Sequence, residues 1–120
     1  MTAKEIGKAG ENTASQYLEK LGYIIIKRNY TISGGEIDII AKDGEYLVFV
    51  EVKTRKNKMF GSGKEAVDGK KLEHMQKCAV KFIYENRANN SIKNLQPRFD
   101  AIEVYTQNGT IEHIKNIDIT

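Results

Sequence analysis

The sequence predicts an α/β fold, a three-layer α/β/α sandwich around a mixed five-stranded sheet. Two segments, one near the N-terminus and one in the middle of the chain, carry apolar residues at helical spacing. Five shorter segments are rich in β-branched residues, and two of their connections contain Asp-Gly or Asn-Gly, which are typical of hairpin turns. Strands that are apolar on both faces need a helical layer on each side of the sheet.

The first helix is expected over residues 3–21, and Gly22 is suited to end it. Its apolar residues share one face: Ile6, Ala14, Tyr17, Leu18 and Leu21. A strand over 23–30 and a loop over 31–35 follow. A hairpin then extends to residue 55 and turns at Asp43-Gly44.

The second helix is expected over residues 67–86, where the apolar stripe consists of Leu72, Met75, Ala79, Phe82 and Ile83. A loop over 85–97 contains the single proline, and strands over 99–105 and 110–117 form a second hairpin around Asn108-Gly109. The predicted order is α-β-β-β-α-β-β. A chain of 120 residues with this order is expected to form one domain, residues 1–120.

The composition indicates a cytoplasmic protein. Cys78 is the sole cysteine, so no internal disulfide can form and a reducing compartment is expected. The N-terminus lacks the apolar core of a signal peptide. The longest apolar run, residues 46–50, is far shorter than the ~20 residues that a membrane span needs.

The distribution of charge points to a phosphate-bearing partner. The net charge is only +3, but the segment from Lys53 to Lys71 holds seven basic residues and two acidic ones. A local basic stripe of this kind is the electrostatic footprint of nucleic-acid binding. The alternative is a solvated loop that serves solubility.

Charged residues also interrupt the apolar hairpin. If Lys42 pairs with Glu45 across the turn, Asp38 and Glu51 become diagonal neighbours, roughly 5–8 Å apart at Cβ, and share a face with Lys53. The opposite face then carries the core residues Ile37, Ile39, Val48, Val50 and Val52. Buried charges cost several kcal/mol unless they are paired or hold a metal ion.

Two carboxylates beside a lysine suit phosphate chemistry. Carboxylate oxygens are ligands for Mg²⁺, which retains waters and meets substrate phosphates directly. Lys53 can orient an attacking water or stabilise charge that develops on the phosphate. The alternative is a surface salt-bridge ladder of Asp38, Glu51 and Lys53.

Four stretches together carry a family resemblance: GKAGENTASQYLEKLGY, GEIDIIAKDGEYLVFVEVKTR, FGSGKEAVDGKK and PRFDAIEV. In this order and spacing they resemble the small bacterial YraN family of the PD-(D/E)XK, or restriction-endonuclease-like, nuclease superfamily. That family is similar to archaeal Holliday junction resolvases. One departure is Ile37-Asp38, where the superfamily pattern has Pro-Asp.

The resemblance implies one restriction-endonuclease-like domain and assigns its site. Asp38 and Glu51 become metal ligands, joined by Glu11 from the first helix and by the backbone carbonyl of Val52, and Lys53 becomes the catalytic lysine. Residues expected to contact nucleic acid are Thr54, Arg55, Lys56, Lys58, Lys64 and Lys71. Arg98 and Asp100 are expected to brace the fourth strand.

The sequence therefore predicts an endonuclease that uses Mg²⁺ or Mn²⁺ to hydrolyse DNA, with branched or structured DNA as the substrate. The similarity to junction resolvases implies a homodimer on DNA. One alternative is a nuclease fold that binds nucleic acid or recruits a partner without cutting; another is an RNA-directed nuclease. A silent module usually loses at least one catalytic residue, whereas Glu11, Asp38, Glu51 and Lys53 are all present.

Overall fold

The computed structural model describes residues 1–57 and 68–117. Its elements are α1 (Ala3–Lys20), β1 (Ile24–Ile32), β2 (Gly35–Asp43), β3 (Tyr46–Arg55), α2 (Gly69–Glu85), β4 (Gln96–Tyr105) and β5 (Ile111–Ile114). The predicted order of helices and strands is confirmed.

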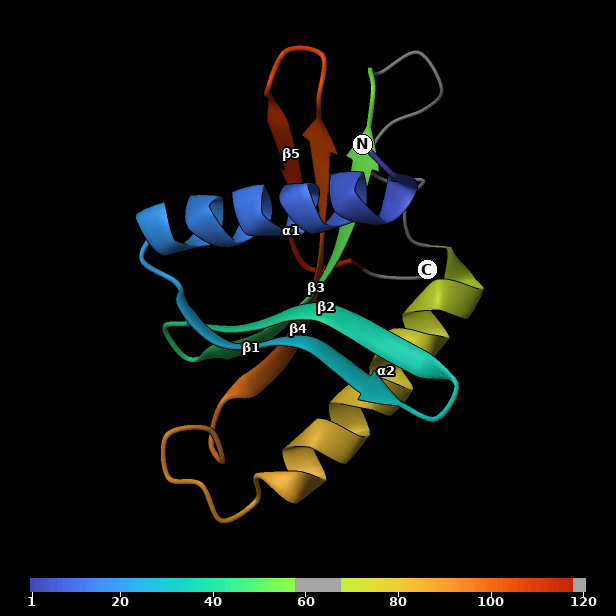
Figure 1. Cartoon of the computed structure of the whole chain (residues 1–120). Helices are drawn as coiled ribbons and strands as arrows, with labels where there is room; N and C mark the ends of the chain where they lie inside the picture. The colour runs from blue at the N-terminus through green and yellow to red at the C-terminus, as the bar shows by residue number, and fades with distance from the viewer. Residues whose placement is uncertain (58–67, 118–120) are drawn as a thin grey trace.

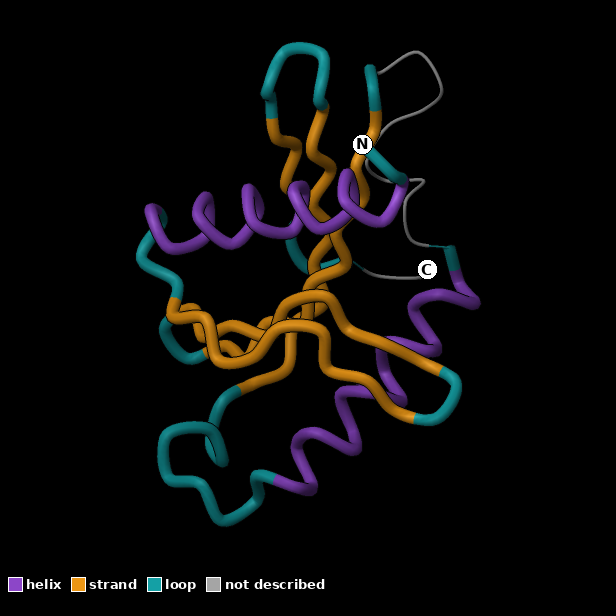
Figure 2. Tube along the Cα trace, viewed as in Figure 1, coloured by secondary structure: helices purple, strands orange, loops and turns teal. Residues whose placement is uncertain are grey.

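The strands form one mixed sheet of five in the order β1-β2-β3-β4-β5. β3 and β4 run parallel, whereas the other neighbouring pairs are antiparallel. Figure 2 shows the twist of this sheet: β1 and β2 cross its lower part, while β4 and β5 rise to the upper hairpin. The predicted α/β class with a mixed five-stranded sheet is confirmed.

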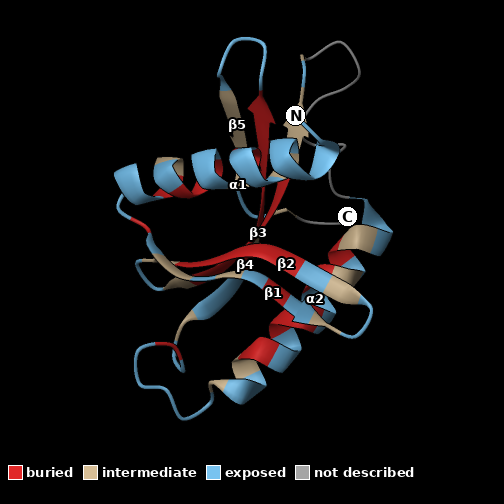
Figure 3. Ribbon diagram, in the orientation of Figure 1, coloured by how far each residue is buried: buried red, intermediate tan, exposed pale blue. Residues whose placement is uncertain are grey.

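The two helices cover opposite faces of the sheet (Figure 1). On one face, Ala14 and Leu18 of α1 pack against strand residues such as Val48 and Val50. On the other, Met75 of α2 belongs to a cluster that includes residues of β2 and β3. Figure 3 shows buried residues concentrated in the central strands and on the inner sides of the helices. Each fully buried large apolar side chain contributes about 1.5–3 kcal/mol through the hydrophobic effect.

Local signals fix the ends of α1. Thr2 and Glu5 form a reciprocal capping box at its start, which satisfies backbone N–H groups that the helix itself leaves unpaired. Gly22 follows the last turn with a φ of +94°, a conformation that favours glycine. The predicted end of the helix at Gly22 is thus confirmed.

The predicted register of the first hairpin is wrong. Asp43 pairs with Tyr46 and Lys42 with Leu47, so the turn consists of Gly44 and Glu45. Gly44 is the first residue of this turn and has a φ of +58°. Two-residue hairpin turns need a positive φ at their first position, which glycine adopts without strain. The shift is by two residues, so between Ile39 and Asp43 it preserves which side chains share a face, and the pairing ends before Asp38 and Glu51.

One core residue and several strand boundaries also differ from the expectation. Ile37 packs in the cluster on the α2 side rather than with Ile39 on the α1 side. β4 begins at Gln96 and therefore includes Pro97, because proline is tolerated at the start of a strand. β1 extends to Ile32, and β5 ends at Ile114. Neither helix within the described residues is long and apolar enough to span a membrane.

Candidate functional site

The candidate site lies where β2 separates from β3. Their backbone pairing runs from the turn to Ile39 and Val50. One step further, the Val52 amide N–H donates to Oδ2 of Asp38 at 2.8 Å. Asp38 and Glu51 are 8% and 4% exposed, respectively, so the alternative of an exposed salt-bridge ladder is wrong. Two buried carboxylates at one position on the sheet need a compensating partner.

Helix α1 delivers a third carboxylate because it approaches β3 closely. Gly10 is buried, and a Cβ atom at this position would collide with the hydroxyl oxygen of Thr54. Glycine therefore allows the helix backbone to rest on β3. The next residue, Glu11, meets Glu36 and Asp38 near the start of β2. This close approach also places the Thr54 hydroxyl against α1.

Three carboxylates converge at this point. One oxygen each from Glu11, Glu36 and Asp38 lie within 4.8 Å of one another. Glu11 also forms an ion pair with Arg28 at 3.8 Å and hydrogen-bonds the side chain of Asn29. Oxygen ligands gathered at this spacing suit a hard divalent cation.

The ionised forms of two carboxyl groups in this cluster, Asp38 and Glu11, are disfavoured. Burial and the nearby charge of Glu51 raise the pKa of Asp38 to about 8, although the hydrogen bond from Val52 opposes the rise. A side-chain hydrogen bond with Glu51 also favours the protonated Asp38 carboxyl group. Burial likewise raises the pKa of Glu11, against the opposing charge of Arg28. Such shifts are typical of sites where like charges are brought together for a function.

Glu51 faces two lysines. Its Oε1 atom lies 3.6 Å from Nζ of Lys53 and 3.3 Å from Nζ of Lys71. Lys53 is carried by β3, whereas Lys71 reaches the site from the first turn of α2. The structure thus brings Lys71 into the group that contains Asp38, Glu51 and Lys53.

The remaining residues expected to contact nucleic acid lie in different settings. The Arg55 guanidinium group is paired with the fully buried Glu103 at 3.3 Å, which indicates a contribution to the core. Lys56 is exposed just beyond β3. Lys58 and Lys64 lie outside the described residues. Only part of the basic stripe therefore lies within the described residues.

The donor set fits a divalent metal ion. Glu11, Asp38 and Glu36 can supply oxygen ligands, and Glu51 lies within hydrogen-bonding reach of Asp38. The structure shows the amide of Val52, rather than its carbonyl, in contact with Asp38. Glu36 was not among the residues that the sequence assigned. Its position two residues before Asp38 on the same strand is the one sequence signal that could have indicated it.

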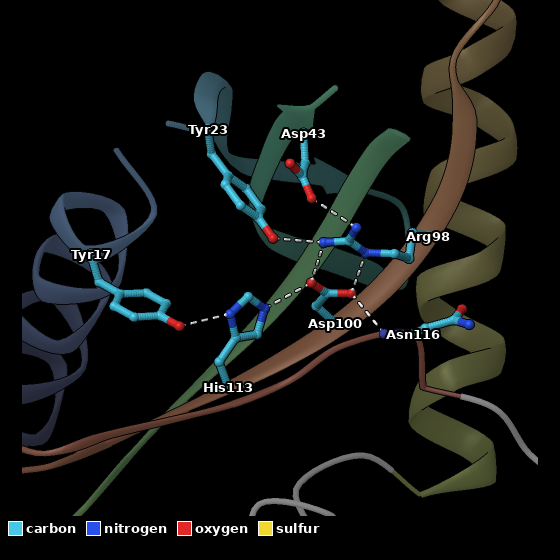
Figure 4. A network of polar contacts seen from close by, with 7 residues as sticks. All are labelled: Tyr17, Tyr23, Asp43, Arg98, Asp100, His113 and Asn116. Carbon is cyan, nitrogen blue, oxygen red and sulfur yellow. Dashed lines mark hydrogen bonds and ion pairs between the residues drawn. The ribbon is translucent and has the colours of Figure 1, made fainter. Parts of the chain in front are cut away.

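A second polar cluster joins the sheet to α1 (Figure 4). Asp100 accepts hydrogen bonds from two nitrogens of Arg98 at 3.0 Å and from the backbone N–H of Asn116. Nε2 of His113 lies 2.8 Å from Asp100, and its Nδ1 lies 3.0 Å from the Tyr17 hydroxyl. Arg98 also donates to Tyr23 and Asp43. The placement of Arg98 and Asp100 agrees with their expected role in bracing the fourth strand.

Asp100→Asn is expected to destabilise the fold by about 3–5 kcal/mol, because it leaves the buried Arg98 charge without its main counter-ion. Burial alone would raise the pKa of Asp100, but the hydrogen bonds from His113, Arg98 and Asn116 lower it overall. The stabilisation is therefore present above the ordinary Asp pKa of 3.8 and is lost as the pH falls below it. Urea unfolding at pH 7 and pH 3 measures both effects.

The control for that experiment is Asp43→Asn, which changes the more exposed partner of Arg98. A loss of only about 0–1 kcal/mol is expected there. If Asp100→Asn were no more destabilising than Asp43→Asn, the network would not brace the fourth strand as described.

The fold and the carboxylate cluster define an α/β protein with a site that can bind a metal ion. A family model described as "Uncharacterised protein family UPF0102" matches residues 10–104. The chain belongs to this family, also called the YraN family, and the expected family membership is confirmed.

Relatives cover almost the full chain. A UPF0102 protein of Carboxydothermus hydrogenoformans is 42% identical over 119 residues, which cover 98% of each chain. A UPF0102 protein of Caldicellulosiruptor saccharolyticus is 44% identical over 105 residues, which cover 88% of this chain and 86% of the relative.

Among solved structures, Pyrococcus furiosus SfsA in complex with Ca²⁺ is similar with a TM-score of 0.35 and 16% identity. The similarity covers 97% of this chain and 65% of that chain.

Proposed function

We propose that the protein is an endonuclease of the PD-(D/E)XK type that uses Mg²⁺ or Mn²⁺ to hydrolyse phosphodiester bonds in DNA, with branched or structured DNA as its substrate. The observation that carries this proposal is the convergence of Glu11, Glu36 and Asp38 beside the pair of Glu51 and Lys53. This arrangement combines metal ligands with a cation that can approach a phosphate.

Each residue has a distinct part in the proposed reaction. Glu11, Asp38 and either Glu36 or Glu51 would hold a divalent cation, which would supply Lewis-acid stabilisation of the charge that develops on the phosphate. The Val52 amide orients Asp38. The Lys53 ammonium group stabilises negative charge on the phosphate or orients the attacking water. Water adds to phosphorus as the bond to one sugar oxygen breaks.

One observation favours a second candidate function, a module that binds nucleic acid without cutting it. Glu51 is paired with both Lys53 and Lys71, so its carboxylate already has cationic partners in the absence of metal. In this second function the lysines and carboxylates form a stable polar cluster, and phosphate binding alone remains.

A cleavage assay separates these functions. Labelled duplex, flap, four-way junction, single-stranded DNA and matching RNA are incubated with Mg²⁺, Mn²⁺, Ca²⁺ or EDTA. The proposal expects cleavage of at least one DNA with Mg²⁺ or Mn²⁺, and binding without cleavage in Ca²⁺. Binding without cleavage under every condition would favour the silent module, and cleavage of RNA alone would identify an RNA-directed nuclease.

The proposed active unit is a cytoplasmic homodimer on branched DNA. Its single cysteine, Cys78, is free and buried in α2, which is consistent with a reducing compartment. Two-fold symmetry would place one site on each of two opposed strands of a branched substrate. Light scattering with and without a four-way junction tests this assembly, and a monomer in both conditions would exclude it.

A further inference from the structure

A cleft beside the carboxylates is formed mainly by one side of α1. It has a volume of about 370 Å³ and is lined by Lys4, Gly7, Lys8, Glu11 and Asn29. Glu11 belongs both to this cleft and to the three converging carboxylates. The cleft therefore borders the candidate metal site at Glu11.

Helix α1 has one side that packs on the sheet and another that borders the cleft. Residues 4, 7, 8 and 11 follow the spacing i, i+3, i+4 and i+7, which places them on one side of a helix. The side that packs on the sheet carries Gly10, Ala14 and Leu18 instead. Lys4 and Lys8 are exposed. The packing of the fold thus does not account for the two lysines that border the cleft.

Gly7 is the residue that the fold explains least. A Cβ atom at Gly10 would collide with Thr54, whereas a Cβ atom at Gly7 would meet nothing within 4 Å. Glycine within a helix is destabilising relative to alanine, so an unobstructed interior glycine has no packing benefit. One established use of such a glycine is to let a ligand approach the backbone closely.

We propose that this cleft receives the sugar-phosphate backbone of the nucleic acid next to the bond that is cut. Lys4 and Lys8 bind phosphates that flank the reactive one, and Gly7 lets the strand lie against α1. Glu11 then lies between the bound nucleic-acid strand and the metal site, because it belongs to both the cleft and the carboxylate cluster. This inference rests on the proposed function and adds a binding surface on α1 to the contacts proposed for Lys53 and Lys71.

The test measures binding of a labelled four-way junction in Ca²⁺ as the salt concentration is varied, with matching RNA as a second probe. Lys4→Gln combined with Lys8→Gln is expected to lower the slope of log K against log salt by about two units, one for each phosphate contact. The matched control is Lys20→Gln, which changes an exposed lysine in the last turn of α1 and leaves the slope unchanged.

Gly7→Ala gives an independent readout. The substitution is expected to raise the thermal midpoint, because alanine favours the helix and meets no neighbour, and to weaken binding of the junction at least severalfold. A purely structural glycine would not give these opposite effects.

The outcomes separate the cleft from the activity. If the wild-type protein binds and cuts DNA while the lysine pair and Gly7→Ala behave like Lys20→Gln, the cleft assignment is wrong and the nuclease proposal stands. If the wild type binds neither DNA nor RNA, both proposals fail. A reduced slope with RNA alone would keep the cleft and change the substrate class.

Discussion

Lys53→Met is expected to reduce DNA cleavage by about 10²–10³-fold or more while leaving folding and DNA binding close to normal. The Lys53 side chain is 43% exposed, and its ammonium group lies 3.6 Å from Glu51. The ammonium group is partly exposed, and Lys71 still pairs with the buried Glu51 after the substitution, so the fold should tolerate the loss of Lys53. The chemical step is different because charge that develops on the phosphate would lose a positioned cation.

Lys71 makes this experiment sharper. It lies 3.3 Å from the same Glu51 oxygen, so it could partly replace Lys53 at the site. Cleavage rates under single-turnover conditions should therefore be compared for Lys53→Met, Lys71→Met and the double variant. Lys81→Met, at an exposed position later in α2, is the matched control. Cleavage by Lys53→Met at the wild-type rate would remove Lys53 from the reaction and point to a contaminating nuclease.

The sequence was sufficient for the order of elements because periodicity and turn residues are local properties. The helix stripe around Leu18 and the turn at Asn108-Gly109 needed no tertiary information. The hairpin register failed for a local reason as well, since Asp43-Gly44 and Gly44-Glu45 are both acceptable turns. Only the pairing of Asp43 with Tyr46 in the structure identifies the second.

The candidate site could be predicted only in part. Asp38 and Glu51 stood out because charges interrupted an apolar hairpin. Glu11 was indicated only by family resemblance, because its position depends on the approach of α1 over Gly10. The pairing of Arg55 with Glu103 depends on the parallel register of β3 and β4, which no local pattern encodes. Residues placed by packing between distant segments are thus the ones that sequence reasoning misses or assigns to another role.

Asp38→Asn is expected to stabilise the metal-free protein while abolishing cleavage. Asn has nearly the shape of Asp, can still accept the Val52 N–H, and cannot ionise. At ~4 Å, two unit charges repel by about 1 kcal/mol in water and about 4 kcal/mol at an effective dielectric of 20. A gain within this range corresponds to a rise of roughly 4–15 °C in the thermal midpoint. Loss of a metal ligand at the same time removes the proposed activity.

The pH dependence of this stabilisation has a defined sign. Burial and Glu51 raise the pKa of Asp38 from 3.8 to about 8, so the folded protein retains a proton that the unfolded chain releases. Ionisation of Asp38 thus penalises the wild-type fold increasingly as the pH rises from 4 to 8. The difference between Asp38→Asn and wild type should be small at pH 4 and largest at pH 8 in EDTA.

Mg²⁺ should reverse the comparison by binding the native wild-type protein. A ligand that binds only the folded state stabilises it by RT ln(1 + [L]/Kd), so the wild-type midpoint should rise with Mg²⁺ and the variant midpoint much less. Glu112→Gln, which changes a carboxylate on β5 and none of the proposed ligands, should respond to Mg²⁺ as the wild type does. Thermal melts of the three proteins in EDTA and in Mg²⁺, each at pH 4 and pH 8, provide the measurement. A destabilised Asp38→Asn and a wild type indifferent to Mg²⁺ would show that the carboxylates are ordinary structural charges, because a convergence of buried like charges should be relieved when one of them is removed.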